Sequence, residues 1–256
     1  VSLFGDSDAM KPPKPPVPAM PHEQNEDYFR NMEKELVGMY LSSHPLDRYA
    51  FEVNAFATNR LDEIDPLVEE SNSNPKLEGC AVSVAGYVTS FTSMVSSVSN
   101  KPWCKFVIED FDGSKEFALF GKDYETFGPK VQLHHTVLIE GEIAPRYYVD
   151  RKDPKAKKPE NTFKIKKISL LGNVSEERVK NLTIEVATDM ITPDFRKNLV
   201  SVLKKHKGKN RFVLKLVDRE SEYVVDFFSK KYAVSVNMSL LDELRGMEVP
   251  YKVVTQ

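Results

Sequence analysis

The sequence predicts a mainly β chain in which a small barrel precedes an α+β domain, and three observations lead to this fold class. Residues 79–171 contain five segments with the alternating apolar and polar pattern of half-buried strands. A short helical pattern lies between the third and fourth segments, at residues 122–130. Farther along, the pattern becomes strand, helix, strands, helix and strand, which is typical of a small α+β domain.

The barrel strands are expected at residues 79–90, 103–111, 115–120, 136–149 and 162–171. Asp112 and Gly113 give a tight-turn signal between the second and third strands. Five strands with one helix after the third is the order of a Greek-key barrel of the OB type. Such a barrel presents strands two and three, with the flanking loops, to oligonucleotides or oligosaccharides.

The chain before the barrel divides into two parts. Residues 1–24 are expected to form a disordered, proline-rich leader, because proline fixes φ and removes a backbone donor. Residues 25–78 are expected to be a helical and irregular linker. Its helix covers residues 25–41 and ends before His44 and Pro45, a short helix begins at Leu46, and residues 54–78 are irregular.

The last domain is expected at residues 173–256, after a barrel domain at residues 79–172. Thr192 and Pro193 are a strong helix-start signal, with threonine as N-cap and proline in the first turn. The expected elements are a strand at 181–191, a helix at 193–206, strands at 211–218, 222–228 and 232–237, a helix at 239–245 and a strand at 249–254.

Charge separates the leader and linker from the two domains. The 256 residues carry a net charge of −2, but residues 1–78 hold seven Lys/Arg against fifteen Asp/Glu. Residues 79–172 hold fourteen against eleven and residues 173–256 hold fifteen against twelve, so only these two parts are basic. Only the basic part suits a polyanion.

No catalytic or phosphate-binding motif is present in the sequence, and we expect no cofactor. Two cysteines give neither a disulfide framework nor a zinc set. Glu109, Asp110 and Asp112 are a weak magnesium candidate, and His134 and His135 would point to opposite faces of a strand. With no signal peptide and no long apolar run, we expect a cytoplasmic chain without a membrane partner.

The pattern favours single-stranded nucleic acid as the ligand. Residues 146–167 contain nine Lys/Arg and three acids with aromatic residues between them, on the hairpin that joins strands four and five. On strand two, Cys104, Phe106 and Ile108 suit the interior, which leaves Trp103, Lys105 and Val107 facing outward. The candidate contacts are Lys101, Trp103, Lys105, Phe120, Arg146, Tyr147, Tyr148, Arg151, Lys152, Lys155, Lys157 and Lys158. A solvated basic loop and aromatic residues that fill an interdomain contact are the alternatives.

Three segments, at residues 33–49, 106–120 and 240–246, carry a resemblance to one known family, the α subunit of bacterial DNA polymerase III. Residues 33–49, with Ser43-His44-Pro45, resemble the helix before its OB domain. Residues 106–120 resemble its second and third barrel strands, and residues 240–246 its closing helix. The resemblance implies a polymerase whose active-site aspartates lie in a palm domain outside this chain, an OB domain associated with single-stranded template, and a last domain associated with the τ subunit of the clamp loader.

The same resemblance gives the first residues a role. The family carries a sliding-clamp-binding pentapeptide of the form Gln-x-x-Leu/Met-Phe ahead of this region, and residues 1–4 match its last four places. Leu3 and Phe4 would be its apolar anchors in a pocket of the clamp. The missing glutamine implies that the motif is cut. The expected partners are therefore single-stranded DNA, the sliding clamp and τ. An anticodon-binding OB module of a tRNA synthetase and a protein-interaction scaffold remain as alternatives.

Overall fold

The computed structural model describes residues 26–97, 100–149, 157–218, 221 and 223–255. The chain divides into two compact units with the boundary between His44 and Pro45. The first unit contains α1, Glu26–Val37. This helix ends earlier than the predicted residue 41, because Gly38 adopts a left-handed conformation with φ of 85° and terminates the helix.

The second unit begins with the short helical segment that the sequence predicts from Leu46. A 3₁₀ turn at Asp47–Tyr49 leads into α2, Ala50–Phe56. The expectation of an irregular stretch at 54–78 is wrong, since α3 covers Ile64–Ser73. Pro66 lies in the first turn of α3, where its missing N–H has no helical acceptor to lose.

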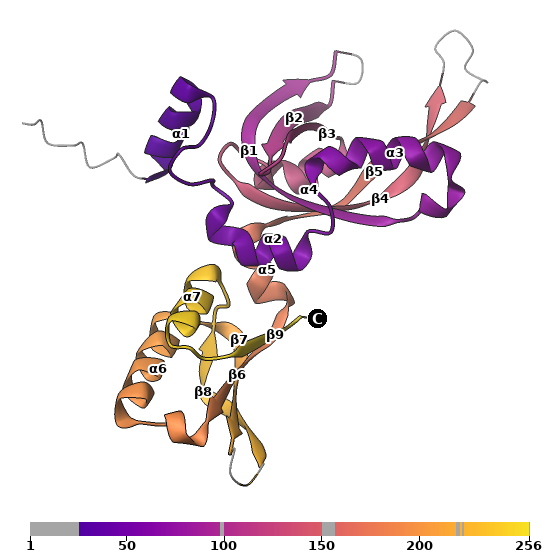
Figure 1. The fold of residues 1–256 in the computed structure, drawn as a ribbon. Coiled ribbons are helices and arrows are strands. Elements are labelled where there is room, and N and C mark those ends of the chain that lie inside the picture. Colours follow the sequence, from indigo (N-terminus) through magenta and orange to yellow (C-terminus); the bar gives the residue numbers. More distant parts are fainter. Residues whose placement is uncertain (1–25, 98–99, 150–156, 219–220, 222, 256) are drawn as a thin grey trace, which may run out of the picture. The chain divides into compact units, whose positions relative to one another are not determined.

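A five-stranded antiparallel sheet forms the predicted barrel, in the order β3-β2-β1-β4-β5 (Figure 1). A helix, α4 (Lys122–Phe127), follows the third strand as expected. The strands are β1 Ala81–Val95, β2 Pro102–Glu109, β3 Ser114–Phe120, β4 Thr136–Val149 and β5 Lys157–Leu170. The long β1 pairs with β4 through its first half and with β2 through its second, with a register shift between Val88 and Ser90.

Alternate residues of these strands fill the barrel. Cys104, Phe106 and Ile108 of β2 are all at most 1% exposed, which confirms the predicted inward face. Phe106 stacks on Phe117 of β3, with 5.7 Å between ring centroids. Burial of one such side chain stabilises the fold by roughly 1.5–3 kcal/mol.

Helix α3 lies along the side of the barrel where β3 and β5 do not pair (Figure 1). Its first residue Ile64 is fully buried in the barrel core. Lys115 of β3 donates to Asp65 at 2.5 Å, and the backbone N–H of Asn161 on β5 donates to the Asn72 side chain at 2.9 Å. The linker therefore completes the barrel.

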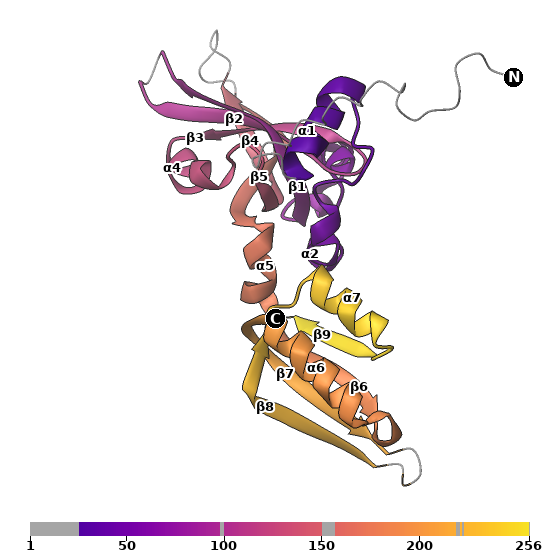
Figure 2. The same ribbon diagram turned by 90° about the vertical axis from the view of Figure 1, so that its left-hand side faces the viewer.

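The last elements form a four-stranded sheet in the order β8-β7-β6-β9, with β6 and β7 parallel and the other pairs antiparallel. The strands are β6 Val179–Ala187, β7 Lys207–Val217, β8 Val224–Val234 and β9 Tyr251–Thr255. Helix α6 (Pro193–Lys205) and helix α7 (Met238–Gly246) cover one face of this sheet (Figure 2). The predicted order of strand, helix, strands, helix and strand is confirmed, with two strands between the helices where three were expected.

Two details differ from the prediction. The two strands expected at 222–228 and 232–237 are one strand, β8, whose register with β7 shifts after Phe228. Helix α5, Leu171–Arg178, lies where a strand end and a loop were expected. Thr192 does cap α6 as predicted, since its hydroxyl accepts from the Phe195 N–H at 3.1 Å.

Candidate nucleic-acid interface

Two aromatic rings stack on the outer face of the barrel. Trp103 of β2 lies directly opposite Phe120 of β3 in the strand register. Their ring centroids are 5.1 Å apart and the ring planes are inclined by only 16°. Phe120 is 57% exposed, whereas Cys104 beside Trp103 is completely buried. The alternation of the two strands thus places both rings outside the core, where a ligand can reach them.

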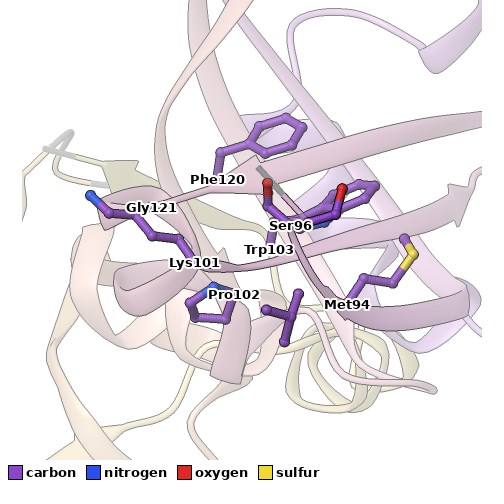
Figure 3. Close-up of a pocket in the computed structure, with 9 residues that line it drawn as sticks. Met94, Ser96, Lys101, Pro102, Trp103, Phe120 and Gly121 are labelled. Carbon is purple, nitrogen blue, oxygen red and sulfur yellow. The ribbon is translucent and has the colours of Figure 1, made fainter. Parts of the chain in front are cut away.

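A hollow of about 780 Å³ lies beside this stack. Figure 3 shows Trp103, Phe120 and the long side chain of Lys101 on its border. The hollow is lined by Met94, Val95, Ser96, Ser97, Lys101, Pro102, Trp103, Phe120 and Gly121. It combines aromatic and aliphatic surface with one exposed cation, a mixture that suits a nucleobase and its phosphate.

Tight turns fix both ends of the hollow. In the β1–β2 hairpin, the Ser96 N–H donates to the Lys101 carbonyl and the Asn100 N–H donates to the Ser96 carbonyl, each at 2.9 Å. Asn100 has φ of 52°, a left-handed conformation that asparagine tolerates. At the other end, Gly121 has φ of 53° and leads from β3 into α4. The loop between β1 and β2 is shorter than the predicted strands at 79–90 and 103–111 imply, because β1 continues to Val95.

Lys105 lies on the same outer face of β2, two residues from Trp103. Its ammonium group is 3.2 Å from a carboxylate oxygen of Glu116 on β3. Both side chains are about half exposed, at 45% and 57%. A solvent-screened pair of this kind contributes little to stability, so Lys105 can exchange Glu116 for a phosphate at small cost.

The remaining predicted contacts are placed only by their backbone or not at all. Arg146, Tyr147 and Tyr148 lie in β4 opposite Glu160, Pro159 and Lys158 of β5, and Lys157 lies opposite Val149. Arg151, Lys152 and Lys155 lie outside the described residues, as do Leu3 and Phe4. The structure therefore brings together Lys101, Trp103 and Phe120, with Lys105 close by along the strand.

The hollow also contains residues that the sequence did not single out. Met94 lies opposite Trp103 in the pairing of β1 with β2 and forms another wall of the hollow. Val95 and Pro102 form the next pair along the same ladder. The sequence pattern that could have identified them is the alternation of apolar and polar residues, which continues beyond Ser90. The many serines in this stretch made it look like a loop instead of a strand.

The acidic cluster near the β2–β3 turn has a structural role. Asp110 accepts backbone hydrogen bonds from Asp112 at 2.9 Å, from Gly113 at 2.8 Å and from Leu61 at 2.8 Å. No set of three or more metal-ligating side chains occurs within the described residues. His134 and His135 lie in the turn before β4 rather than on a strand. His134 Nδ1 is 2.6 Å from the Tyr87 hydroxyl, and His135 Nδ1 is 2.9 Å from the Lys130 carbonyl.

The chain is similar to alpha subunits of DNA polymerase III. Residues 182–254 match the family described as "DNA polymerase III alpha subunit, C-terminal domain". DNA polymerase III subunit alpha of Haemophilus influenzae is 26% identical over 176 residues, which are 69% of this chain and 14% of that protein. The same subunit of Mycobacterium tuberculosis (strain H37Rv) is 24% identical over 253 residues, 97% of this chain and 20% of that protein. These matches confirm the resemblance predicted from the sequence.

A solved structure of the mitochondrial single-stranded DNA binding protein Rim1 from S. cerevisiae covers 37% of this chain and 97% of its own. Its sequence identity is 19% and its TM-score is 0.25. This chain spans a fifth or less of the length of the two polymerase subunits named above. In the described part of the chain, no helix is both long enough and apolar enough to cross a membrane.

Proposed function

Because the chain resembles the DNA polymerase III alpha subunits over nearly its whole length, we propose that it is the non-catalytic C-terminal part of such a polymerase. The parent protein would be a DNA-directed DNA polymerase of the bacterial cytoplasm. In this proposal the barrel binds single-stranded template, and the two ends of the chain tether the polymerase to the sliding clamp and the clamp loader. The observation that carries the DNA-binding part is the exposed Trp103–Phe120 stack beside Lys101.

The geometry favours single-stranded over double-stranded DNA. A base can stack on an exposed aromatic ring only when its own face is free, which requires that it leave a duplex. Each stacked base contributes about 1–3 kcal/mol, largely regardless of its identity. Lys101 and Lys105 lie beside the rings and would contact the phosphates, which makes the binding dependent on salt. The basic β4–β5 hairpin, Arg146–Lys158, would extend this path.

The tethering part of the proposal has separate support. The domain that contains β6–β9 matches a family named for the C-terminal domain of the polymerase subunit, and we propose that it docks the τ subunit. Leu3 and Phe4 would bind the clamp. Surface plasmon resonance of the 256-residue chain over immobilised τ and clamp tests both contacts separately. Clamp binding should disappear in the Leu3→Ala/Phe4→Ala variant, while τ binding should remain.

A fluorescence-anisotropy titration tests the DNA proposal and separates it from its rivals. The expected result is tight binding of a labelled oligothymidylate, with weaker binding of a hairpin duplex and of tRNA. A preference for tRNA would favour the anticodon-binding module instead. Equal and negligible affinity for all three at low salt would leave the barrel as a protein-interaction scaffold.

A further inference from the structure

A second hollow, of about 580 Å³, adjoins the hollow beside the Trp103–Phe120 stack. Phe120 lines both of them, and it is the only described residue that they share. The second hollow is named the seam hollow, because it lies along the side of the barrel where β3 and β5 do not pair. Its walls come from β3, β4, β5, α3 and α4. A DNA strand that passes over Phe120 toward β5 therefore enters the seam hollow next.

An aromatic pair forms part of the seam hollow. Phe117 of β3 and Phe163 of β5 meet edge to face, with 6.1 Å between their ring centroids and 61° between the ring planes. Phe117 is 8% exposed and belongs to the barrel core, whereas Phe163 is half-buried and packs only against the edge of that core. The seam hollow thus offers a base the ring of Phe163 in addition to that of Phe120.

The backbone of β4 leaves room for Phe163 at this position. Gly141 lies at the register shift between β4 and β5, and a Cβ atom there would be 2.6 Å from the Phe163 ring. Because Gly141 has no side chain, the ring can lie against the β4 backbone. Such irregularities in a ladder often re-aim a side chain beside a binding site. The barrel itself therefore holds Phe163 at the hollow.

The charges of the seam hollow differ from those of the first hollow. The first hollow is lined by Lys101 and by no acid. Three carboxylates and two lysines line the seam hollow, and these are Asp65, Glu116, Asp123, Lys115 and Lys164. An excess of carboxylates repels a phosphate, but a carboxylate accepts hydrogen bonds from the amino group of a base. The first hollow therefore suits a phosphate, and the seam hollow suits the edge of a base.

Only some of the polar groups in the seam hollow are free to bind a ligand. Lys115 donates to Asp65 at 2.5 Å, and Glu116 lies 3.2 Å from the ammonium group of Lys105. Three polar side chains of the lining form no hydrogen bond or ion pair with any residue that the structure describes, and these are Asp123, Thr162 and Lys164. The hollow thus presents one free carboxylate as acceptor, with a hydroxyl and an ammonium group as donors.

We propose that the seam hollow binds the base next to the stacked one in a single strand, and that Asp123 favours a base with an exocyclic amino group. This inference rests on the proposed binding of DNA by the barrel. The Asp123 carboxylate would accept from the amino group of cytosine, adenine or guanine. Thymine has no such group, so it cannot make this hydrogen bond and is disfavoured. Thr162 and Lys164 would donate to the oxygen or ring nitrogen acceptors of the same base.

Fluorescence anisotropy with two labelled oligonucleotides of equal length tests the proposal at neutral pH. Oligodeoxycytidylate and oligothymidylate are suitable probes, because both bases are pyrimidines and only cytosine carries an amino group. The measured quantity is the ratio of their affinities for the 256-residue chain. The variant Asp123→Ala should lower the cytidylate-to-thymidylate ratio by about two- to tenfold, since only the cytidylate loses a hydrogen bond.

Glu125→Ala is the matched control. Glu125 is an exposed acid of the same helix, α4, and lines neither hollow, so its removal changes the net charge equally and should leave the ratio as in the parent. An identical ratio in the parent and in Asp123→Ala, or the same change in both variants, would overturn the base selection while DNA binding by the barrel stands. A parent chain that binds neither oligonucleotide would overturn the proposed function, and this inference with it.

Discussion

The Trp103 indole and the Phe120 ring stack face to face across β2 and β3, 5.1 Å apart, although neither is needed to fill the barrel. Each ring shields one face of the other from water, and Phe120 still exposes 57% of its surface. The two residues therefore form a preorganised aromatic surface, which would lose little side-chain entropy when a base stacks on it.

Removing either ring should weaken the binding of single-stranded DNA. Trp103→Ala and Phe120→Ala each remove one partner of the stack, so we expect affinity to fall by about 5- to 150-fold, from the stacking energy of about 1–3 kcal/mol for one base. Fluorescence anisotropy with an oligothymidylate measures the change. Phe111→Ala is the control, because Phe111 is a 52% exposed aromatic residue near the β2–β3 turn that does not line the hollow. An equal loss of DNA affinity in all three variants would show that the Trp103–Phe120 stack is not part of the DNA interface.

Neutralising the basic hairpin should change the salt dependence of binding rather than its sequence preference. Alanine at Arg151, Lys152, Lys155, Lys157 and Lys158 should lower affinity and reduce the slope of log K against log salt, because fewer counterions are released. Alanine at five exposed lysines of the C-terminal domain removes the same charge and is the control; these are Lys180, Lys197, Lys204, Lys207 and Lys252. An unchanged slope would exclude the hairpin from the DNA path.

Gly141→Ala should destabilise the barrel. A Cβ atom at this position would lie 2.4 Å from the Lys164 carbonyl oxygen and 2.6 Å from the Phe163 ring, at a register shift between β4 and β5. The expected loss is about 1–3 kcal/mol in the free energy of unfolding, measured by urea denaturation. Gly246→Ala, whose Cβ would meet nothing within 4 Å, should change stability by no more than about 0.5 kcal/mol. Similar changes in the free energy of unfolding for both variants would contradict the close approach of Gly141 to Lys164 and Phe163.

Glu52 should make stability fall as the pH rises. It is 2% exposed, accepts a hydrogen bond from the Ser175 hydroxyl at 2.6 Å, and its Oε2 has no hydrogen-bond partner among the described residues. Burial raises the pKa of this carboxyl above its ordinary value of 4.5, so the folded state holds the proton more tightly than the unfolded state. The stabilisation is complete below pH 4.5 and is lost as the pH rises through the folded-state pKa.

Glu52→Gln tests this directly, because glutamine keeps the shape of the side chain and does not titrate. Urea denaturation between pH 4 and pH 8 should show the variant gaining stability relative to the parent as the pH increases. A difference that is constant or declines with pH would show that Glu52 is not a strained buried carboxylate.

The sequence correctly predicted structural features that depend on one strand alone, such as which side chains face into the barrel. Alternation in β2 correctly separated Cys104, Phe106 and Ile108 from the outward Trp103. It could not show that Phe120 lies opposite Trp103, because cross-strand partners depend on the length of the β2–β3 turn, and a one-residue slip would reverse the face. The lining residue Met94 was missed for the same reason, since its place depends on the pairing of β1 with β2.

Helices outside the barrel were less predictable. Pro66 and Pro75 lie in the stretch 54–78 that was expected to be irregular. Helix α3 nevertheless begins just before Pro66, which the first helical turn tolerates, and ends before Pro75. The burial of Ile64 in the barrel stabilises this helix, and such tertiary packing leaves little trace in local propensity.

The carboxylate of Asp110 connects two parts of the chain that are far apart in sequence. One oxygen holds the β2–β3 turn, and the other accepts from Leu61, ahead of α3. A truncation that began at the first strand would leave this buried acceptor without a donor and uncover the open side of the barrel. The smallest piece of the chain that can be expected to retain a native barrel therefore starts before Leu61, and experiments on an isolated barrel should begin there.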